Sequence, residues 1–83
     1  MPRDPGELRA IVVATLQTIA PEIDAGALRA DRPLRQQVDL DSMDWLNFLI
    51  GLSRTLGVAI PETDYRRLVS IDELVRYLRE KTG

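Results

Sequence analysis

The sequence predicts an all-α protein: a bundle of four helices, with three main helices, one short third helix, and a long loop between helices one and two. Apolar residues recur at helical spacing in three separate segments, and each of these segments begins with residues that can cap a helix. No segment alternates apolar and polar residues over any length, as a half-buried strand would. The 83 residues suffice for one small hydrophobic core, so we expect a single domain over residues 1–83.

The first helix is predicted from Pro5 to about Ile19. Asp4 can cap its N-terminus and Pro5 suits the first helical position. Pro21 disfavours helical geometry at Ala20, so the helix should end there. Between these limits, apolar residues recur at helical spacing: Leu8, Ile11, Val12, Leu16 and Ile19.

A long loop is predicted between Pro21 and Asp41, because helical periodicity is lost and prolines and a glycine interrupt the segment. A connection of this length without any structure is unusual in a compact domain. We therefore expect short turns within it, held in place by four isolated apolar residues: Ile23, Leu28, Leu34 and Val38.

The second helix is predicted from Ser42 or Met43 to Leu56, with Asp41 or Ser42 as N-cap and Gly57 as its C-terminal stop. Its side chains fall on two faces, with Leu46 between them. The face expected to be buried holds Trp45, Leu49, Leu52 and Leu56. The face expected to be largely accessible holds Met43, Asn47, Ile50 and Arg54. An accessible apolar stripe on a small domain indicates a docking surface.

The last third of the chain is predicted to contain a short helix and a long one, after an extended link. The short helix has one or two turns, begins at Thr63 or Asp64 and ends at Leu68. The long helix follows Ser70, which forms a capping box with the glutamate three residues later, and extends to about Lys81. Its apolar residues stand at positions i, i+3, i+4 and i+7: Ile71, Leu74, Val75 and Leu78.

Composition argues against several classes of protein. The chain has no Cys and no His, so it lacks disulfides, the usual zinc ligands and the usual general base at neutral pH. A net charge of −2 and scattered arginines give no nucleic-acid footprint. No apolar stretch approaches the ~20 residues that span a bilayer, and residues 1–5 lack the apolar core of a secretory signal. We expect a cytoplasmic monomer with protein partners and no membrane, nucleic-acid or metal ligand.

The most informative residues are Asp41-Ser42-Met43-Asp44, at a junction between loop and helix. A serine at a helix N-terminus exposes its hydroxyl beside unpaired backbone N–H groups, in a positive field that favours an approaching phosphate. This motif resembles the attachment motif of acyl carrier proteins. The similarity covers nearly the whole chain, including the order of the helices and three further features: the Ile60-Pro61 link, the Ser70 cap and Tyr77 in the last helix.

The resemblance implies an acyl-carrier-like bundle and a carrier function. A separate phosphopantetheinyl transferase would use Mg²⁺ and coenzyme A to attach a 4′-phosphopantetheine arm to Ser42. Acyl intermediates would then be carried on the arm's thiol as thioesters, delivered and processed by acyl-loading and acyl-processing enzymes. The protein would not be an enzyme but a stand-alone carrier, modified by and serving enzymes of fatty acid biosynthesis or of a specialised lipid or secondary-metabolite pathway. An imported sulfur also accounts for the lack of Cys and His.

The predicted partner-binding residues depart from the family pattern. Familiar fatty-acid carriers present several acids along the second helix, whereas here Asp41 and Asp44 flank the serine and the helix continues with apolar residues and an arginine. We expect the two acids to complement the helix dipole and to contact basic groups of the transferase. The docking face is expected to comprise Met43, Leu46, Asn47, Ile50 and Arg54. The alternative is that Met43 and Ile50 are ordinary surface or edge-of-core residues.

Several alternatives stay open. Ser42 could be a plain N-cap, and Asp39, where the family often has glycine, could adopt left-handed geometry or change the loop. Asp39 and Asp41 fall short of an EF-hand, whose longer ligand series ends in glutamate. The bulky residues Trp45, Leu49, Leu52, Leu74, Val75 and Tyr77 either form an ordinary core or fill the space where the family holds an acyl chain, which would restrict cargo to short or polar groups. Alternative functions are an aminoacyl or peptidyl carrier and an unmodified helical adaptor.

Overall fold

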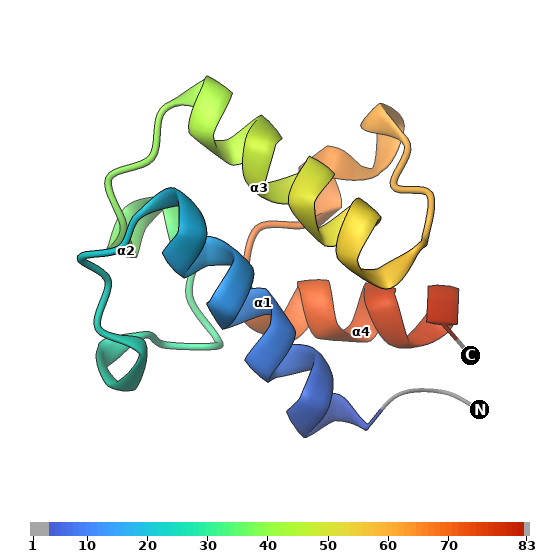
Figure 1. Ribbon diagram of the computed structural model, residues 1–83, viewed down its shortest axis with the longest axis horizontal. Coiled ribbons are helices and arrows are strands. Elements are labelled where there is room, and N and C mark those ends of the chain that lie inside the picture. Colours follow the sequence, from blue (N-terminus) through green and yellow to red (C-terminus); the bar gives the residue numbers. More distant parts are fainter. Residues whose placement is uncertain (1–3, 83) are drawn as a thin grey trace.

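The computed structural model describes residues 4–82. The predicted domain, residues 1–83, and the segment 1–5 that was compared with a secretory signal therefore lie partly outside the described residues. Its elements follow in the order α1 (Pro5–Ile19), η1 (Ala25–Ala27), α2 (Leu34–Gln37), α3 (Ser42–Leu56), η2 (Glu62–Arg67) and α4 (Ile71–Thr82). Residues 4–82 form three long helices and contain no strand, so the predicted all-α fold is confirmed (Figure 1). None of the helices in this range is both long and apolar enough to cross a bilayer.

The three long helices begin and end close to where the sequence predicts. Asp4 caps α1 and accepts a hydrogen bond from the Gly6 N–H, while Ala20 leaves helical geometry. Gly57 ends α3 with a φ of 65°, in the left-handed region that glycine adopts without steric cost. The Ser70 hydroxyl accepts the Glu73 N–H at 3.2 Å, which caps α4, but the second bond of the predicted capping box, from the Ser70 N–H to the Glu73 side chain, is absent from residues 4–82.

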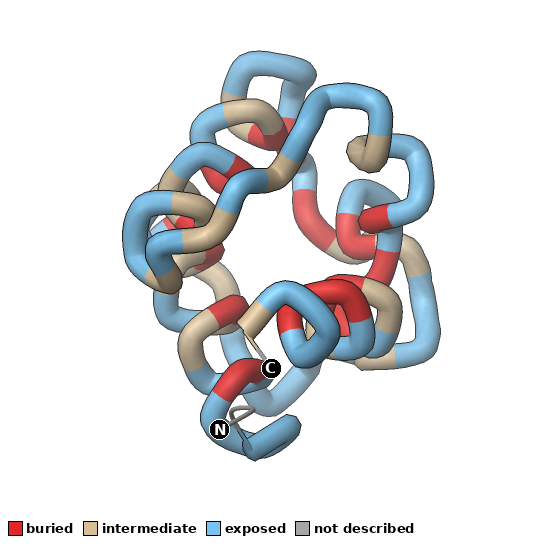
Figure 2. The backbone as a smooth tube through the Cα atoms, turned by 90° about the vertical axis from the view of Figure 1, so that its right-hand side faces the viewer, coloured by how far each residue is buried: buried red, intermediate tan, exposed pale blue. Residues whose placement is uncertain are grey.

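The hydrophobic core lies where α1 packs against both α3 and α4 (Figure 1). The buried stretches of the chain face the inside of the molecule, whereas the connecting segments are mostly exposed (Figure 2). The core residues of the three helices are Leu8, Val12 and Leu16, then Trp45, Phe48, Leu49 and Leu52, then Ile71, Leu74, Tyr77 and Leu78.

The predicted buried face of α3 needs two corrections. Leu56 is only half-buried, because it is the last residue of the helix and lies at the edge of the core. Phe48 is fully buried but does not belong to the predicted face, although it stands three residues after Trp45 and four before Leu52, which is the spacing of one helical face. Val75 on α4 is likewise half-buried.

The long loop contains short turns, as predicted. Three of its four apolar residues, Leu28, Leu34 and Val38, are buried, and Ile23 is half-buried against the core. Two backbone hydrogen bonds tie the loop to the start of α4: Leu34 N–H donates to the Val69 carbonyl at 2.8 Å, and Asp72 N–H donates to the Ala30 carbonyl at 3.0 Å. The loop is therefore fixed to the beginning of α4.

The short third helix differs in detail from its prediction. It is a 3₁₀ helix that begins at Glu62, one or two residues before the predicted start, and Leu68 follows it as the C-cap instead of belonging to it. Pro61 supplies the extended residue before the first turn. Because 3₁₀ turns suit short connectors, this segment can link α3 to α4 in a few residues.

Candidate functional site

The start of α3 is set by Asp41. This residue has an extended backbone, and its carboxylate accepts the Asp44 N–H at 2.8 Å while its carbonyl accepts the Trp45 N–H at 3.0 Å. Asp41 is thus the N-cap and Ser42 is the first helical residue. The alternative that Ser42 is the N-cap is wrong, because the carboxylate one residue earlier already fills that role.

The Ser42 side chain is exposed, and its hydroxyl makes no hydrogen bond with any residue in 4–82. The backbone N–H groups of Ser42 and Met43 also lack a partner in this range, as the geometry of a first helical turn requires. A free hydroxyl therefore stands beside two free donors at the positive end of a 15-residue helix. This arrangement fits a phosphate ester, because the donors and the dipole both favour an anion at that point.

The acids of the motif have different surroundings. Asp39 and Asp41 are exposed, whereas Asp44 is half-buried in the first turn. Asp39 has a negative φ, so the left-handed alternative is wrong and the backbone there is one that any residue can adopt. Within residues 4–82 no three acidic side chains come close enough together to hold a metal ion.

The second face of α3 is accessible. Met43 is 64% exposed and Ile50 36% exposed, which makes them two of the large apolar side chains that reach solvent in the described range. Asn47 and Arg54 on the same face are also exposed, and Leu46 between the two faces is half-buried. The structure thus brings the predicted docking residues to one outer surface that begins beside Ser42.

A pocket beside the start of α3 was not predicted. It has a volume of about 310 Å³ and is lined by Pro33, Arg35, Trp45, Tyr65, Arg66 and Val69. Trp45 lies one helical turn after Ser42, and its ring also packs against the Phe48 ring at 5.3 Å. The other lining residues come from the loop and from the η2 region, which share no periodicity in the sequence. No pattern in the sequence predicts that these segments lie side by side.

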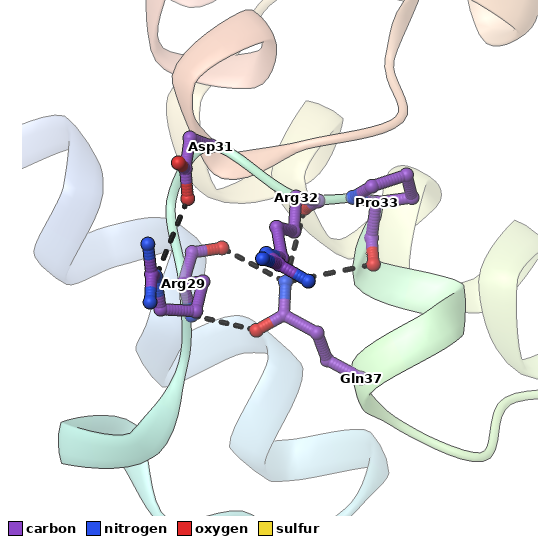
Figure 3. Close-up of polar contacts among 5 residues, drawn as sticks. All are labelled: Arg29, Asp31, Arg32, Pro33 and Gln37. Carbon is purple, nitrogen blue, oxygen red and sulfur yellow. Dashed lines mark hydrogen bonds and ion pairs between the residues drawn. The ribbon is translucent and has the colours of Figure 1, made fainter.

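The loop wall of this pocket is braced by Gln37 (Figure 3). Its side-chain oxygen accepts the Arg29 N–H at 2.6 Å, and its nitrogen donates to the carbonyls of Arg29 at 2.8 Å and Arg32 at 3.0 Å. The same nitrogen donates a longer hydrogen bond, of 3.5 Å, to the Pro33 carbonyl. Figure 3 shows the amide lying between the two backbone segments, so one side chain fixes the turn that leads into α2.

The opposite segment, η2, is tied to α4 by Tyr77. The buried Tyr77 hydroxyl donates to the Asp64 carboxylate at 2.6 Å. Burial and, next, the hydrogen bond to Asp64 raise the pKa of Tyr77 to about 12. Lys81 and Arg67 lie near the Tyr77 ring, with their charged groups 5.4 and 6.0 Å from its centroid. Tyr77 therefore holds the segment that supplies Tyr65 and Arg66 to the pocket.

The arrangement of the helices matches that of a solved structure. The solution structure of a protein from Anaplasma phagocytophilum, described as an acyl carrier protein, matches this one with a TM-score of 0.82. The match covers 93% of this chain and 90% of the other at 21% sequence identity, so it establishes similarity of fold alone.

Comparison of sequences identifies the family. A family model described as the phosphopantetheine attachment site matches residues 7–78. An acyl carrier protein of Campylobacter jejuni (strain 81-176) is 28% identical over 72 residues, 87% of this chain and 87% of the relative. One of Lactobacillus johnsonii is 30% identical over 57 residues, 69% of this chain and 71% of the relative. The chain therefore belongs to the acyl carrier protein family.

Family membership implies a covalently attached 4′-phosphopantetheine group. It also implies interaction with a phosphopantetheinyl transferase and with acyl-processing enzymes in general. The homologues are carriers and not enzymes. The free hydroxyl and unpaired N–H groups at the start of α3 fit this group, since they offer an attachment atom and donors for a phosphate.

Proposed function

We propose that Ser42 is the residue that receives the 4′-phosphopantetheine group from coenzyme A, and that the chain is a discrete acyl carrier of one domain. The observation that carries the proposal is the exposed Ser42 hydroxyl, free of any hydrogen bond within residues 4–82, at the first position of α3. The arm supplies a thiol on which acyl groups are held as thioesters.

The chain's own residues prepare this site. Asp41 takes the capping role, so the Ser42 hydroxyl is not used in holding the helix together. The N–H groups of Ser42 and Met43 can donate to the phosphate oxygens once the ester forms. Asp41 and Asp44 give the surface around the serine a negative charge, which attracts basic groups of the transferase.

The attachment test is incubation with coenzyme A, Mg²⁺ and a broad-specificity transferase, followed by intact mass. The wild-type chain and Ser53→Ala should each gain one phosphopantetheine group, whereas Ser42→Ala should gain none. Ser53 is the matched control because it lies on the same helix and its hydroxyl is bonded to the Val58 carbonyl. An unmodified wild-type chain, with a known carrier fully modified in parallel and a transferase from the same genome also tested, would favour the unmodified adaptor instead.

The exposed face of α3, comprising Met43, Leu46, Asn47, Ile50 and Arg54, is proposed to bind particular partner enzymes through apolar contacts. Ile50→Glu places a charge in the middle of this face and should weaken binding of cognate enzymes by about tenfold or more, equivalent to ~1.4 kcal/mol. Ala14→Glu adds the same charge at an exposed position of α1 and should have little effect. Unchanged loading and transfer with Ile50→Glu would remove this docking face from the account.

The pathway is proposed to be a specialised lipid or secondary-metabolite pathway, in the cytoplasm, with the carrier acting as a monomer. Fully buried Phe48, Leu49 and Leu74 fill the interior, which supports cargo that is short or polar. Amide spectra of the free-thiol and octanoyl forms should differ little at Leu49, Ile60 and Leu74. Large shifts there would show that an acyl chain enters the core. Loading by an amino-acid-activating enzyme instead of an acyl-loading enzyme would favour an aminoacyl carrier.

A further inference from the structure

The pocket beside Trp45 combines two kinds of lining. Pro33, Trp45, Tyr65 and Val69 supply apolar surface, and Val69 is 40% exposed. Arg35 and Arg66, which come from two different segments, α2 and η2, also line the pocket, and each carries a positive charge. Such a lining suits a ligand with a short apolar part and an anionic end.

The two arginines are free to bind an anion. Within residues 4–82, neither Arg35 nor Arg66 takes part in an ion pair or a side-chain hydrogen bond. A guanidinium group pairs with a carboxylate through two parallel N–H donors, and this geometry is specific as well as strong. The pocket therefore has an unmatched positive charge beside apolar surface.

Two other pockets make the contrast clear. One along α4 is lined by Arg67, Leu68, Glu73, Arg76, Tyr77 and Glu80, and its neighbour by Pro5, Asp72, Val75, Arg76, Arg79 and Glu80. In each of these, two arginines are balanced by two acids. The lining of the pocket beside Trp45 has two arginines and no acid, so it alone among the three is complementary to an anion.

The pocket also lies within reach of the proposed attachment point. Trp45 follows Ser42 by one helical turn, so an arm on Ser42 starts next to the pocket. A short flexible tether gives its free end an effective concentration of about millimolar, and a weak site is then enough to hold it. No separate binding of a free ligand is needed.

The walls of the pocket are held before any ligand arrives. Gln37 braces the turn that carries Pro33, as Figure 3 shows, and the Leu34 N–H joins this wall to the Val69 carbonyl. Tyr77 ties η2, which carries Arg66, to α4 through Asp64. Binding therefore requires ordering of the arginine side chains and the arm, and little rearrangement of the backbone.

We propose that this pocket binds the acyl end of the arm on Ser42 and selects a short acyl group that bears a carboxylate, a half-thioester of a dicarboxylic acid. This inference rests on the proposed function. The apolar rings contact the methylene groups, and Arg35 and Arg66 pair with the distal carboxylate. The lining of the pocket thereby indicates which class of acyl group the carrier holds.

The experiment compares two cargoes of equal chain length, glutaryl and pentanoyl, attached through stable amide analogues of the arm. Intact mass first establishes that each arm is attached, which tests the proposed function separately. Trp45 is the only tryptophan in the chain, so its indole N–H signal and fluorescence report on this pocket. We expect the glutaryl arm to shift the Trp45 signal several-fold more than the pentanoyl arm, relative to the free-thiol form.

Arginine variants identify the contact. The combined change Arg35→Gln and Arg66→Gln should reduce the glutaryl-induced shift to that of pentanoyl, whereas Arg79→Gln, an exposed arginine on α4, should leave it unchanged. A ¹³C-labelled distal carboxyl group should titrate with a pKa lowered by about one unit in the wild type and unperturbed in the double variant, because nearby positive charge favours the carboxylate. Equal Trp45 shifts for the two cargoes would overturn this inference while leaving Ser42 attachment intact. So would a carboxyl pKa that is the same in the wild type and in the double arginine variant. Absence of any adduct would overturn both.

Discussion

The interior of the bundle and the surroundings of Ser42 are built in different ways. The interior is made mainly by three regular helices whose apolar residues repeat at helical spacing, and it contains no buried side-chain polar atom without a partner in the described range. The pocket near Ser42 is made largely by two segments of loop and short helix, residues 29–37 and 62–69, which are held by individual polar contacts. Regular packing gives the fold its stability, whereas single side chains such as Gln37 and Tyr77 position the site.

The largest effect is expected from the interior. Phe48→Ala should lower the free energy of unfolding by about 3–5 kcal/mol, because it removes a fully buried ring and leaves a cavity. Leu56→Ala, at the half-buried end of the same helix, should cost markedly less. Urea unfolding measures both. Equal losses would contradict the distinction between the core face and the end of α3.

Gln37→Ala should have a smaller and more local effect. The change removes the hydrogen bonds of the Gln37 side chain shown in Figure 3. It should lower the free energy of unfolding by about 1–2 kcal/mol and no more, since the exposed backbone groups recover hydrogen bonds from water. Hydrogen exchange should accelerate in residues 29–37 and not in α1. Gln36→Ala is the matched control, because the neighbouring side chain is exposed and makes no hydrogen bond in the described range. Identical hydrogen exchange in the two variants would mean that the hydrogen bonds of Gln37 do not order the loop.

Tyr77→Phe should cost about 1 kcal/mol at neutral pH by removing the hydroxyl bond to Asp64. It should also change the pH dependence of stability. The pKa of Tyr77 is raised to about 12 in the fold from an ordinary value of 10.0, so its contribution is complete below pH 10 and is lost as the pH rises towards 12. Unfolding measured at pH 9 and pH 11 should show an alkaline loss that is smaller in Tyr77→Phe. A loss of the same size in both proteins would exclude Tyr77 as its source.

Periodic residues explain why much of the fold could be predicted. The spacing of Leu8, Val12 and Leu16, and the caps at Asp4 and Ser70, place α1 and α4 within a residue or so of their observed ends. The same rule of spacing also predicts burial of Phe48, which lies on one helical face with Trp45 and Leu52. The motif around Ser42 could be located, but its cap could not be assigned, since aspartate and serine are both good N-caps.

The pocket and its supports could not be predicted. Gln37 and Asp64 look like ordinary surface residues in the sequence, and their contacts depend on where the loop and η2 lie in space. Arg35 and Arg66 are 31 positions apart and lie on elements of four and six residues, too short for a helical face to be recognised. Helical spacing relates residues within one helix, whereas this pocket joins three segments.

The central claim is that the start of α3 is the attachment site, and direct localisation of the arm tests it. Trypsin releases a peptide of residues 36–54, which contains both Ser42 and Ser53. Fragmentation of this peptide from the modified protein distinguishes the two hydroxyls. We predict that every fragment ion containing Ser42 carries the phosphopantetheine group and that no fragment with Ser53 alone does. An arm on Ser53, or on Ser70 in another peptide, would contradict the account.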